Sequence, residues 1–143
     1  MKGPAVIDAS VALKWFLIED GSEAAADLLP AILGGQCIGL VPELFYHEVF
    51  AVMVRKHPDP AAWAGRGFAW LESLPLVRRP MDSVLTRIAE RFCRMGLTGY
   101  DATYAALAEE SGAPWLSFDQ RAAAALGNPG WIVRPGSTDT FQD

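Results

Sequence analysis

Short apolar runs alternate with longer segments of mixed polarity along this chain. Each run contains bulky apolar residues and is too short for a buried helix, so it predicts a strand. The predicted strands cover residues 5–8, 37–41, 76–78, 115–119 and 131–133. The segments between them place apolar residues at helical spacing, which predicts helices with one buried side. These helices are expected at residues 11–17, 22–33, 43–56, 60–74, 81–95, 101–111 and 120–126.

Residues with strong capping preferences stand at the ends of these segments. Ser10 is expected to cap the helix at 11–17, and Asp59, followed by a proline, to cap the helix at 60–74. Gly112 is expected to end the helix at 101–111. The alternation of strands and helices predicts an α/β fold, with a parallel twisted sheet of about five strands and helices on both faces. We expect one domain at residues 1–135 and a loosely ordered tail at 136–143.

Two of the predicted strands end on an aspartate that leads directly into a helix. Asp8 closes the first run, and Asp119 closes the fourth. A single aspartate in this position is more often a turn or capping residue than a catalyst. Parallel α/β sheets bind ligands at the carboxyl ends of their strands, where the strand order reverses. If the first and fourth strands are neighbours, the two carboxylates converge there.

Two further acids can face the same edge of the sheet. Asp101 stands at the start of its helix, and Glu48 shares a helical face with Leu44 and Val52, one turn before and after it. A carboxylate on an apolar stripe must be paired, protonated or bound to a metal, unless it lies at the exposed edge of the stripe. Four carboxylates brought together cannot all stay ionised without cations.

Hard divalent cations with oxygen ligands, Mg²⁺ or Mn²⁺, are the natural partners of such a cluster. A site of this kind suits hydrolysis of a phosphodiester by a metal-activated water, and no nucleophile from the chain is needed. His47 and Glu48 begin like a zinc-protease motif, but Ala51 stands where that motif requires a second histidine. A zinc protease is therefore excluded.

Composition narrows the class without deciding the function. The 143 residues are 51% hydrophobic and 20% charged, which predicts a packed domain rather than disorder. The net charge of −5 argues against a general affinity for nucleic acid, although bound cations would offset it locally. No apolar run approaches the ~18 residues of a membrane span, and the N-terminus has no signal-peptide pattern, so a cytoplasmic protein is expected. Cys37 and Cys93 are interpreted as buried free thiols.

The chain resembles the PIN-domain ribonucleases, and its opening resembles the VapC toxins of toxin–antitoxin pairs. The resemblance extends from residue 5 to about residue 133 and rests on the order and spacing of four motifs, none of which is specific alone. They lie at residues 6–16, 42–48, 100–108 and 116–119.

The resemblance implies a Mg²⁺- or Mn²⁺-dependent endoribonuclease that forms a homodimer and cuts structured RNA such as tRNA or ribosomal RNA. It also implies a cognate VapB-type antitoxin as inhibitor. By position, the metal-site and catalytic acids would be Asp8, Glu48, Asp101 and Asp119. Ser117 would be the supporting hydroxyl, and Ser10 would act similarly from the first strand.

One departure from the family pattern leaves an alternative open. Ala51 stands three residues after Glu48, where family members often have an asparagine. Its loss would remove a hydrogen-bonding group that supports the site. The alternative is a PIN-fold module that binds RNA or protein without catalysis.

Two other phosphate-handling folds with acids at strand ends fit poorly. A phospho-acceptor receiver domain needs paired acids after its first strand, where Ile7 precedes Asp8. A haloacid dehalogenase phosphatase needs a second aspartate where Ser10 stands.

The helix at 60–74 carries a stripe of large apolar residues that has two interpretations. Trp63, Trp70 and Leu74 share this stripe, and large apolar side chains usually pack in a core. Aromatic residues are also enriched at interfaces. We therefore consider these three residues either as core or as a surface for a dimer or for the antitoxin.

Overall fold

The computed structural model describes residues 2–137 and contains one sheet whose paired strands all run parallel. The strands are β1 (Gly3–Ile7), β2 (Cys37–Pro42), β3 (Val77–Arg79), β4 (Trp115–Leu116) and β5 (Ile132–Val133). Their spatial order is β3-β2-β1-β4-β5. The predicted class, an α/β domain built on a parallel sheet, is confirmed.

The strand order reverses at the centre of the sheet. β1 pairs with β2 on one side, where Val6 lies opposite Leu40, and with β4 on the other, where Val6 lies opposite Trp115. The chain runs outward through β2 and β3 and then crosses back to β4. The first and fourth strands are therefore neighbours, and their carboxyl ends form the switch point at which open α/β sheets bind ligands.

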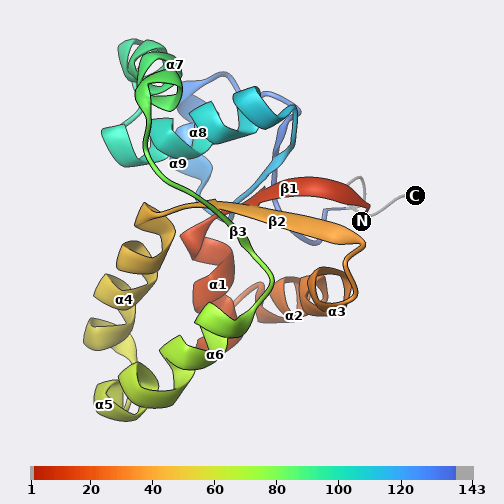
Figure 1. Ribbon diagram of the computed structural model, residues 1–143, viewed down its shortest axis with the longest axis vertical. Coiled ribbons are helices and arrows are strands. Elements are labelled where there is room, and N and C mark those ends of the chain that lie inside the picture. The colour runs from red at the N-terminus through yellow and green to blue at the C-terminus, as the bar shows by residue number, and fades with distance from the viewer. Residues whose placement is uncertain (1, 138–143) are drawn as a thin grey trace.

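Helices cover both faces of the sheet (Figure 1). One side carries α1 (Ala9–Phe16), α2 (Ser22–Ala26), α3 (Leu28–Leu33), α4 (Leu44–Lys56), α5 (Pro60–Ala62) and α6 (Phe68–Ser73). The other carries α7 (Ser83–Arg94), α8 (Gly99–Ser111) and α9 (Gln120–Ala125). Helix α8 packs against β1, β2 and β4, and its side chains from Ala102 to Ala108 are all buried. It therefore forms the centre of that layer.

The ends of α8 and α5 follow the sequence closely. Thr98 caps α8 by accepting a hydrogen bond at Oγ1 from the Asp101 N–H at 3.2 Å. Gly112 ends the same helix at a φ of 62°, a left-handed conformation that favours glycine. Asp59 caps α5 through a 3.1 Å bond from the Ala62 N–H. The sequence predicts Asp59 and Gly112 in these roles because such signals act over three or four residues, whereas α8 begins at Gly99, two residues before the expected start.

Two helix predictions need correction. Ser10 does not cap α1: Asp8 is the cap, and its Oδ2 accepts a hydrogen bond from the Ser10 N–H at 2.8 Å. The helix expected at residues 22–33 is broken at Asp27 into α2 and α3. Pro30 explains the break, because it lacks the N–H that a continuous helix would bond to the carbonyl of residue 26.

The helix expected at residues 60–74 is also interrupted, by a π-helical turn, η1 (Trp63–Gly67). A Cβ at Gly67 would lie 2.3 Å from the Trp63 indole, so glycine is what lets that ring fold over the turn. Trp63 and Leu74 are 3% and 5% exposed, whereas Trp70 is 39% exposed. Trp63 and Leu74 therefore belong to the core. Of the three residues considered for a partner surface, Trp70 is the one that remains accessible.

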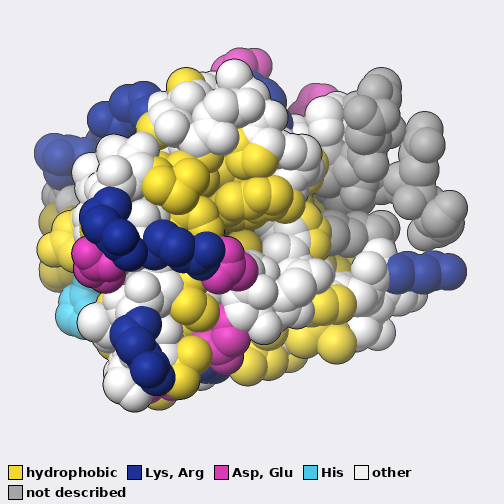
Figure 2. Space-filling view, turned by 90° about the horizontal axis from the view of Figure 1, so that it is seen from above, with side chains coloured by type: hydrophobic (Ala, Val, Ile, Leu, Met, Phe, Trp, Pro, Cys, Tyr) yellow, Lys and Arg dark blue, Asp and Glu magenta, His cyan; other side chains and the backbone are white. Residues whose placement is uncertain are grey.

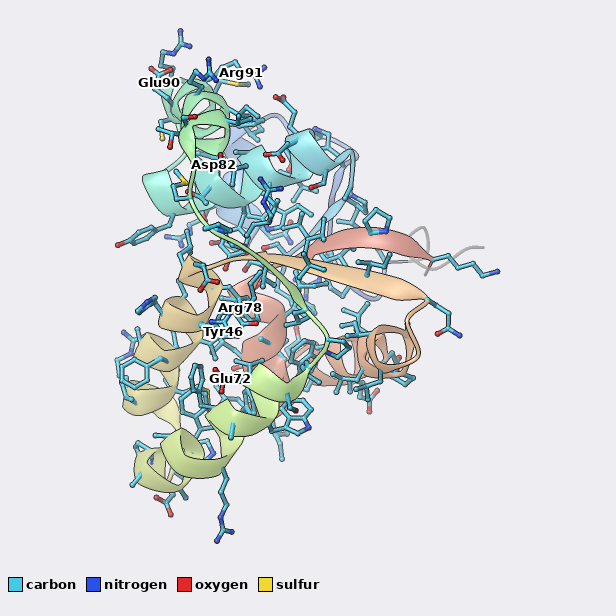
Figure 3. All side chains as sticks on the ribbon, in the orientation of Figure 1. Tyr46, Glu72, Arg78, Asp82, Glu90 and Arg91 are labelled. Atoms are coloured by element: carbon cyan, nitrogen blue, oxygen red, sulfur yellow. The ribbon has the colours of Figure 1, made fainter. Side chains whose placement is uncertain are left out.

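A cluster of charged and aromatic side chains fastens edge strand β3 to the helices on one face (Figure 3). The Arg78 guanidinium lies 3.9 Å from the centre of the Tyr46 ring and donates hydrogen bonds to Glu43 at 3.1 and 3.3 Å. It also lies 3.8 Å from Glu72 of α6. This cluster therefore fixes the edge strand to the helices of that face.

The remaining expectations concern the termini, the membrane and the cysteines. Most of the predicted tail, from residue 138 onward, lies outside the described residues. Across residues 2–137 no helix has the length and apolar character needed to cross a membrane. Cys37 is buried as expected, but Cys93 is exposed because it lies on the outer side of α7.

Candidate active site

Asp8 is held rigidly at the junction of β1 and α1. It is only 7% exposed, and its backbone N–H donates to the Leu116 carbonyl of β4 at 3.0 Å. Its Oδ1 accepts a 3.1 Å hydrogen bond from the Trp115 indole, while its Oδ2 caps the helix. Burial raises the pKa of this carboxyl, and the charge of Asp101 adds to the effect.

Glu48 reaches the same region from α4. Its Oε1 accepts a 2.7 Å hydrogen bond from the Tyr104 hydroxyl of α8. The pKa of Glu48 is raised to about 7, mainly by burial and also by the charges of Asp8 and Asp101, while the Tyr104 hydrogen bond lowers it. Near neutral pH this carboxyl is therefore only partly ionised, because its negative charge is disfavoured by burial and by the nearby acids.

Asp101 and Asp119 complete the set predicted from the sequence. Asp101 lies in the first turn of α8, and burial followed by the charge of Asp119 raises its pKa. Asp119 does not close β4 as expected, because the strand ends at Leu116 and Asp119 follows three residues later as the cap of α9. It binds the Arg121 guanidinium at 3.3 and 3.1 Å, and this contact lowers its pKa. The four acids therefore come from four separate places in the chain and act on one another electrostatically.

Ser10 and Ser117 connect the ends of β1 and β4. Ser10 Oγ accepts a hydrogen bond from the Phe118 N–H at 2.9 Å, and Ser117 Oγ accepts one from the Asp119 N–H at 3.0 Å. The two hydroxyl oxygens lie 3.5 Å apart. Both hydroxyls therefore hold the loop that presents Asp119, which agrees with a supporting role.

Sequence reasoning missed three residues that contact these acids: Tyr104, Trp115 and Arg121. Tyr104 stands three residues after Asp101 in the same helix, and this spacing could have indicated a shared face. Trp115 was treated only as an apolar strand residue, and its partner Asp8 is 107 residues away in the chain. A pairing over that distance leaves no local signal.

The donor set has the chemistry of a divalent-cation site. It consists of carboxylate oxygens, the ligands that Mg²⁺ and Mn²⁺ prefer. Burial is the main cause of the raised pKa values of Asp8, Glu48 and Asp101, and the charge of a neighbouring acid adds to each of them. Between residues 2 and 137, however, no three His, Cys, Asp or Glu side chains stand close enough together to hold one ion. The side chains have the right ligand atoms for a divalent cation, but they would have to move closer to one another to bind it.

Several surface arginines are paired with acids. Figure 2 shows Lys and Arg side chains beside Asp and Glu on the side seen from above, around a group of hydrophobic side chains. The ion pairs include Arg79 with Glu110, Arg91 with Glu109 and Arg94 with Glu90. These arginines therefore do not form an uncompensated basic patch for phosphates.

Comparison with known proteins gives a family and a fold. The family model described as PIN domain matches residues 5–126. No curated protein matches the chain.

Similar solved structures include the VapC20 toxin of Mycobacterium tuberculosis, described as cleaving the sarcin-ricin loop, at 18% identity and a TM-score of 0.68 over 92% of this chain and 99% of that one. They also include PAE2754 of Pyrobaculum aerophilum, at 23% identity and a TM-score of 0.62 over 85% of this chain and 78% of that one. VapBC2 of Rickettsia felis, bound to promoter DNA, has 8% identity and a TM-score of 0.64 over 92% of this chain and 97% of that one.

Proposed function

This chain belongs to the PIN domain family, and we propose that it is a metal-dependent endoribonuclease that cuts structured RNA such as tRNA or ribosomal RNA. The observation that carries the proposal is the arrangement of Asp8, Glu48, Asp101 and Asp119. They come from four separate parts of the chain, Asp8 follows the strand at which the sheet order reverses, and the charges of neighbouring acids add to the raised pKa values of Asp8, Glu48 and Asp101. The fold shared with a toxin described as cleaving RNA of the sarcin-ricin loop supports the choice of substrate.

The four acids would hold Mg²⁺ or Mn²⁺, and Ser10 and Ser117 would keep Asp119 in place. When bound, the cation supplies an activated water and offsets the charge that develops on the phosphate. Neither serine is suited to attack the substrate, because each hydroxyl oxygen already accepts a hydrogen bond from a backbone N–H. Asp119 must share its carboxylate between the cation and Arg121, which is 89% exposed and free to move toward solvent.

Metal removal tests this proposal directly. The purified protein, incubated with total tRNA and ribosomal RNA, should produce discrete fragments in Mg²⁺ or Mn²⁺, because the carboxylates alone offer no activated nucleophile. EDTA should stop cleavage, and an excess of Mn²⁺ should restore it. Fragments are read on denaturing gels. Cleavage that continues at full rate in EDTA would contradict a metal-dependent mechanism.

A non-catalytic PIN-fold module that binds RNA or protein remains the second candidate. Two observations favour it: Ala51 stands where the supporting asparagine is expected, and in the described chain no three acids are close enough to hold an ion together. Asp8→Asn separates the two functions. An enzyme loses metal-dependent cleavage in this variant, whereas a binding module cleaves in neither form and keeps its affinity for RNA.

We further propose a VapC-type toxin that forms a homodimer and is neutralised by a VapB-type antitoxin. The similarity in fold to VapC20 and VapBC2 supports this assignment. Trp70 is the part of the predicted surface that remains accessible: its ring packs edge-on against Trp15 and Phe16 while 39% of its surface faces solvent. An exposed aromatic side chain anchored in this way is typical of interface centres.

Trp70→Glu should therefore weaken association with the antitoxin or with a second copy by about 10-fold or more, since truncating an aromatic anchor costs about 2 kcal/mol. Sedimentation equilibrium and calorimetric titration measure the two associations. Met95→Glu introduces the same charge at an exposed position after α7, beyond the other face of the sheet, and serves as the control. Equal behaviour of the two variants in both associations would exclude Trp70 from the interface.

A further inference from the structure

We propose that Tyr104 and Trp115 are positioning residues that set the placement of the carboxylates of Glu48 and Asp8. The inference rests on the proposed function, because it concerns how these two acids are prepared for a cation. Neither aromatic residue is expected to touch the substrate, since Tyr104 is 1% exposed and Trp115 is completely buried.

The two aromatic rings form one rigid unit in the centre of the core. Tyr104 comes from α8 and Trp115 from β4, and their rings are stacked, with 5.7 Å between centroids and 2° between planes. Close packing leaves large buried rings little freedom to change orientation. Polar atoms at the edges of this stack therefore have fixed positions.

Each ring uses its single polar group on one of the acids. The Tyr104 hydroxyl donates to Glu48 Oε1 at 2.7 Å, and the Trp115 indole donates to Asp8 Oδ1 at 3.1 Å. Glu48 lies on α4 and Asp8 precedes α1, so the stack ties both carboxylates to one body. The second oxygen of Asp8 is held as well, by the Ser10 N–H at 2.8 Å, and the bond to Glu48 Oε1 restricts the orientations open to the rest of that carboxylate.

A second buried indole shows that these bonds are not a general consequence of packing a tryptophan. Trp63 is 3% exposed and makes tilted or edge-on ring contacts with Phe16 and Phe68. Within the described residues its Nε1 is the buried side-chain atom without a hydrogen-bond partner. The core thus accommodates a tryptophan for its bulk alone, whereas the Trp115 indole nitrogen is directed at a carboxylate that the proposed reaction uses.

The test compares Mn²⁺ binding by the metal-free protein and its variants, measured by calorimetry. Tyr104→Phe keeps the ring and the stack and removes only the hydroxyl, and Trp115→Phe removes the indole N–H. Each should lower Mn²⁺ affinity by about 10-fold or more, the usual effect of removing a group that orients a metal ligand. In a Glu48→Gln background, Tyr104→Phe should cause no additional loss, because it acts through Glu48.

Matched controls separate positioning from structural support. Trp63→Phe shortens a buried tryptophan whose indole nitrogen has no partner, and Tyr46→Phe removes a hydroxyl from a buried tyrosine of α4. Both should keep Mn²⁺ affinity within about twofold of the unaltered protein, even where their melting temperatures fall as far as those of the test variants.

The outcomes are distinguishable. If the unaltered protein binds no Mn²⁺, the proposed metal site is wrong and this inference falls with it. If the unaltered protein binds Mn²⁺ and Tyr104→Phe binds it equally well, the positioning role alone is overturned. If the control variants lose as much Mn²⁺ affinity as the test variants, the positioning role is also overturned, and the stacked rings only support the fold. Should Trp115→Phe fail to fold, Tyr104→Phe decides the question, since it leaves the packing intact.

Discussion

Asp101→Asn is expected to reduce metal-dependent RNA cleavage by roughly 100- to 1000-fold, the usual effect of removing one element of charge stabilisation from an active site. The amide keeps the size of the side chain and loses its charge. Burial and the charge of Asp119 already raise the pKa of Asp101, so removing the charge relieves repulsion in the metal-free protein. The variant should therefore melt at the same temperature as the unaltered protein, or higher.

The measurement is the initial rate of fragment formation in Mn²⁺, alongside thermal unfolding of the metal-free protein. Glu90→Gln is the matched control, because Glu90 is an exposed acid on α7 that pairs with Arg94. It should retain full cleavage and exclude a contaminating nuclease when both variants are purified in the same way. Retention of more than about a tenth of the rate by Asp101→Asn would remove this residue from the catalytic set.

Glu48→Gln is expected to have opposite effects on catalysis and on stability. Cleavage should fall by about 100-fold or more, because one cation ligand loses its charge. The stability effect follows from the pKa of about 7, raised from the model-peptide value of 4.5. A carboxyl whose folded pKa is raised binds more protons when folded, so it lowers the free energy of unfolding as the pH rises from about 4.5 to 7.

The metal-free Glu48→Gln protein should therefore melt above the unaltered protein at pH 8 and level with it at pH 4, below both pKa values. Glu48 is partly exposed, and solvent screening reduces the expected gain to about 1 kcal/mol, or roughly 3 °C. The Tyr104 bond survives, because a glutamine oxygen can accept it. Saturating Mn²⁺ should reverse the order at pH 8, since the unaltered protein binds the ion more tightly.

Thermal unfolding at both pH values, with EDTA or with Mn²⁺, checks these expectations. Glu109→Gln, which removes an exposed acid of α8 that pairs with Arg91, is the control for a change in net charge. A melting temperature for metal-free Glu48→Gln that lies below that of the unaltered protein at pH 8 would mean that the ionised carboxylate stabilises the fold. Glu48 would then be a structural residue rather than a group poised for a cation.

The sequence alone determined the features that depend on neighbouring residues. The period of apolar positions indicated the alternation of strands and helices, and Asp59 and Gly112 mark helix ends because capping acts within one turn. Asp8 could be placed at a strand end for the same reason, and Asp119 at a helix start shortly after β4, which ends at Leu116. Since parallel strands share one direction, their carboxyl ends, and therefore these acids, had to lie at the same edge of the sheet.

Only the tertiary structure decided which distant groups meet. Ser10 looks like a helix cap until the Phe118 N–H, 108 residues later, is seen to occupy its hydroxyl. The stripe of residues 63–74 has the same pattern for a core and for an interface, and packing buries Trp63 and Leu74 while leaving Trp70 partly exposed.

The same holds for the candidate site. Trp115 lies 107 residues from Asp8, and Tyr104 lies 56 residues from Glu48. Hydrogen bonds between residues so far apart in sequence depend on how the helices pack on the sheet. This packing involves the whole chain, and the local pattern of apolar residues does not predict it. The sequence therefore identified the candidate acids, while the folded core determined which groups hydrogen-bond to them.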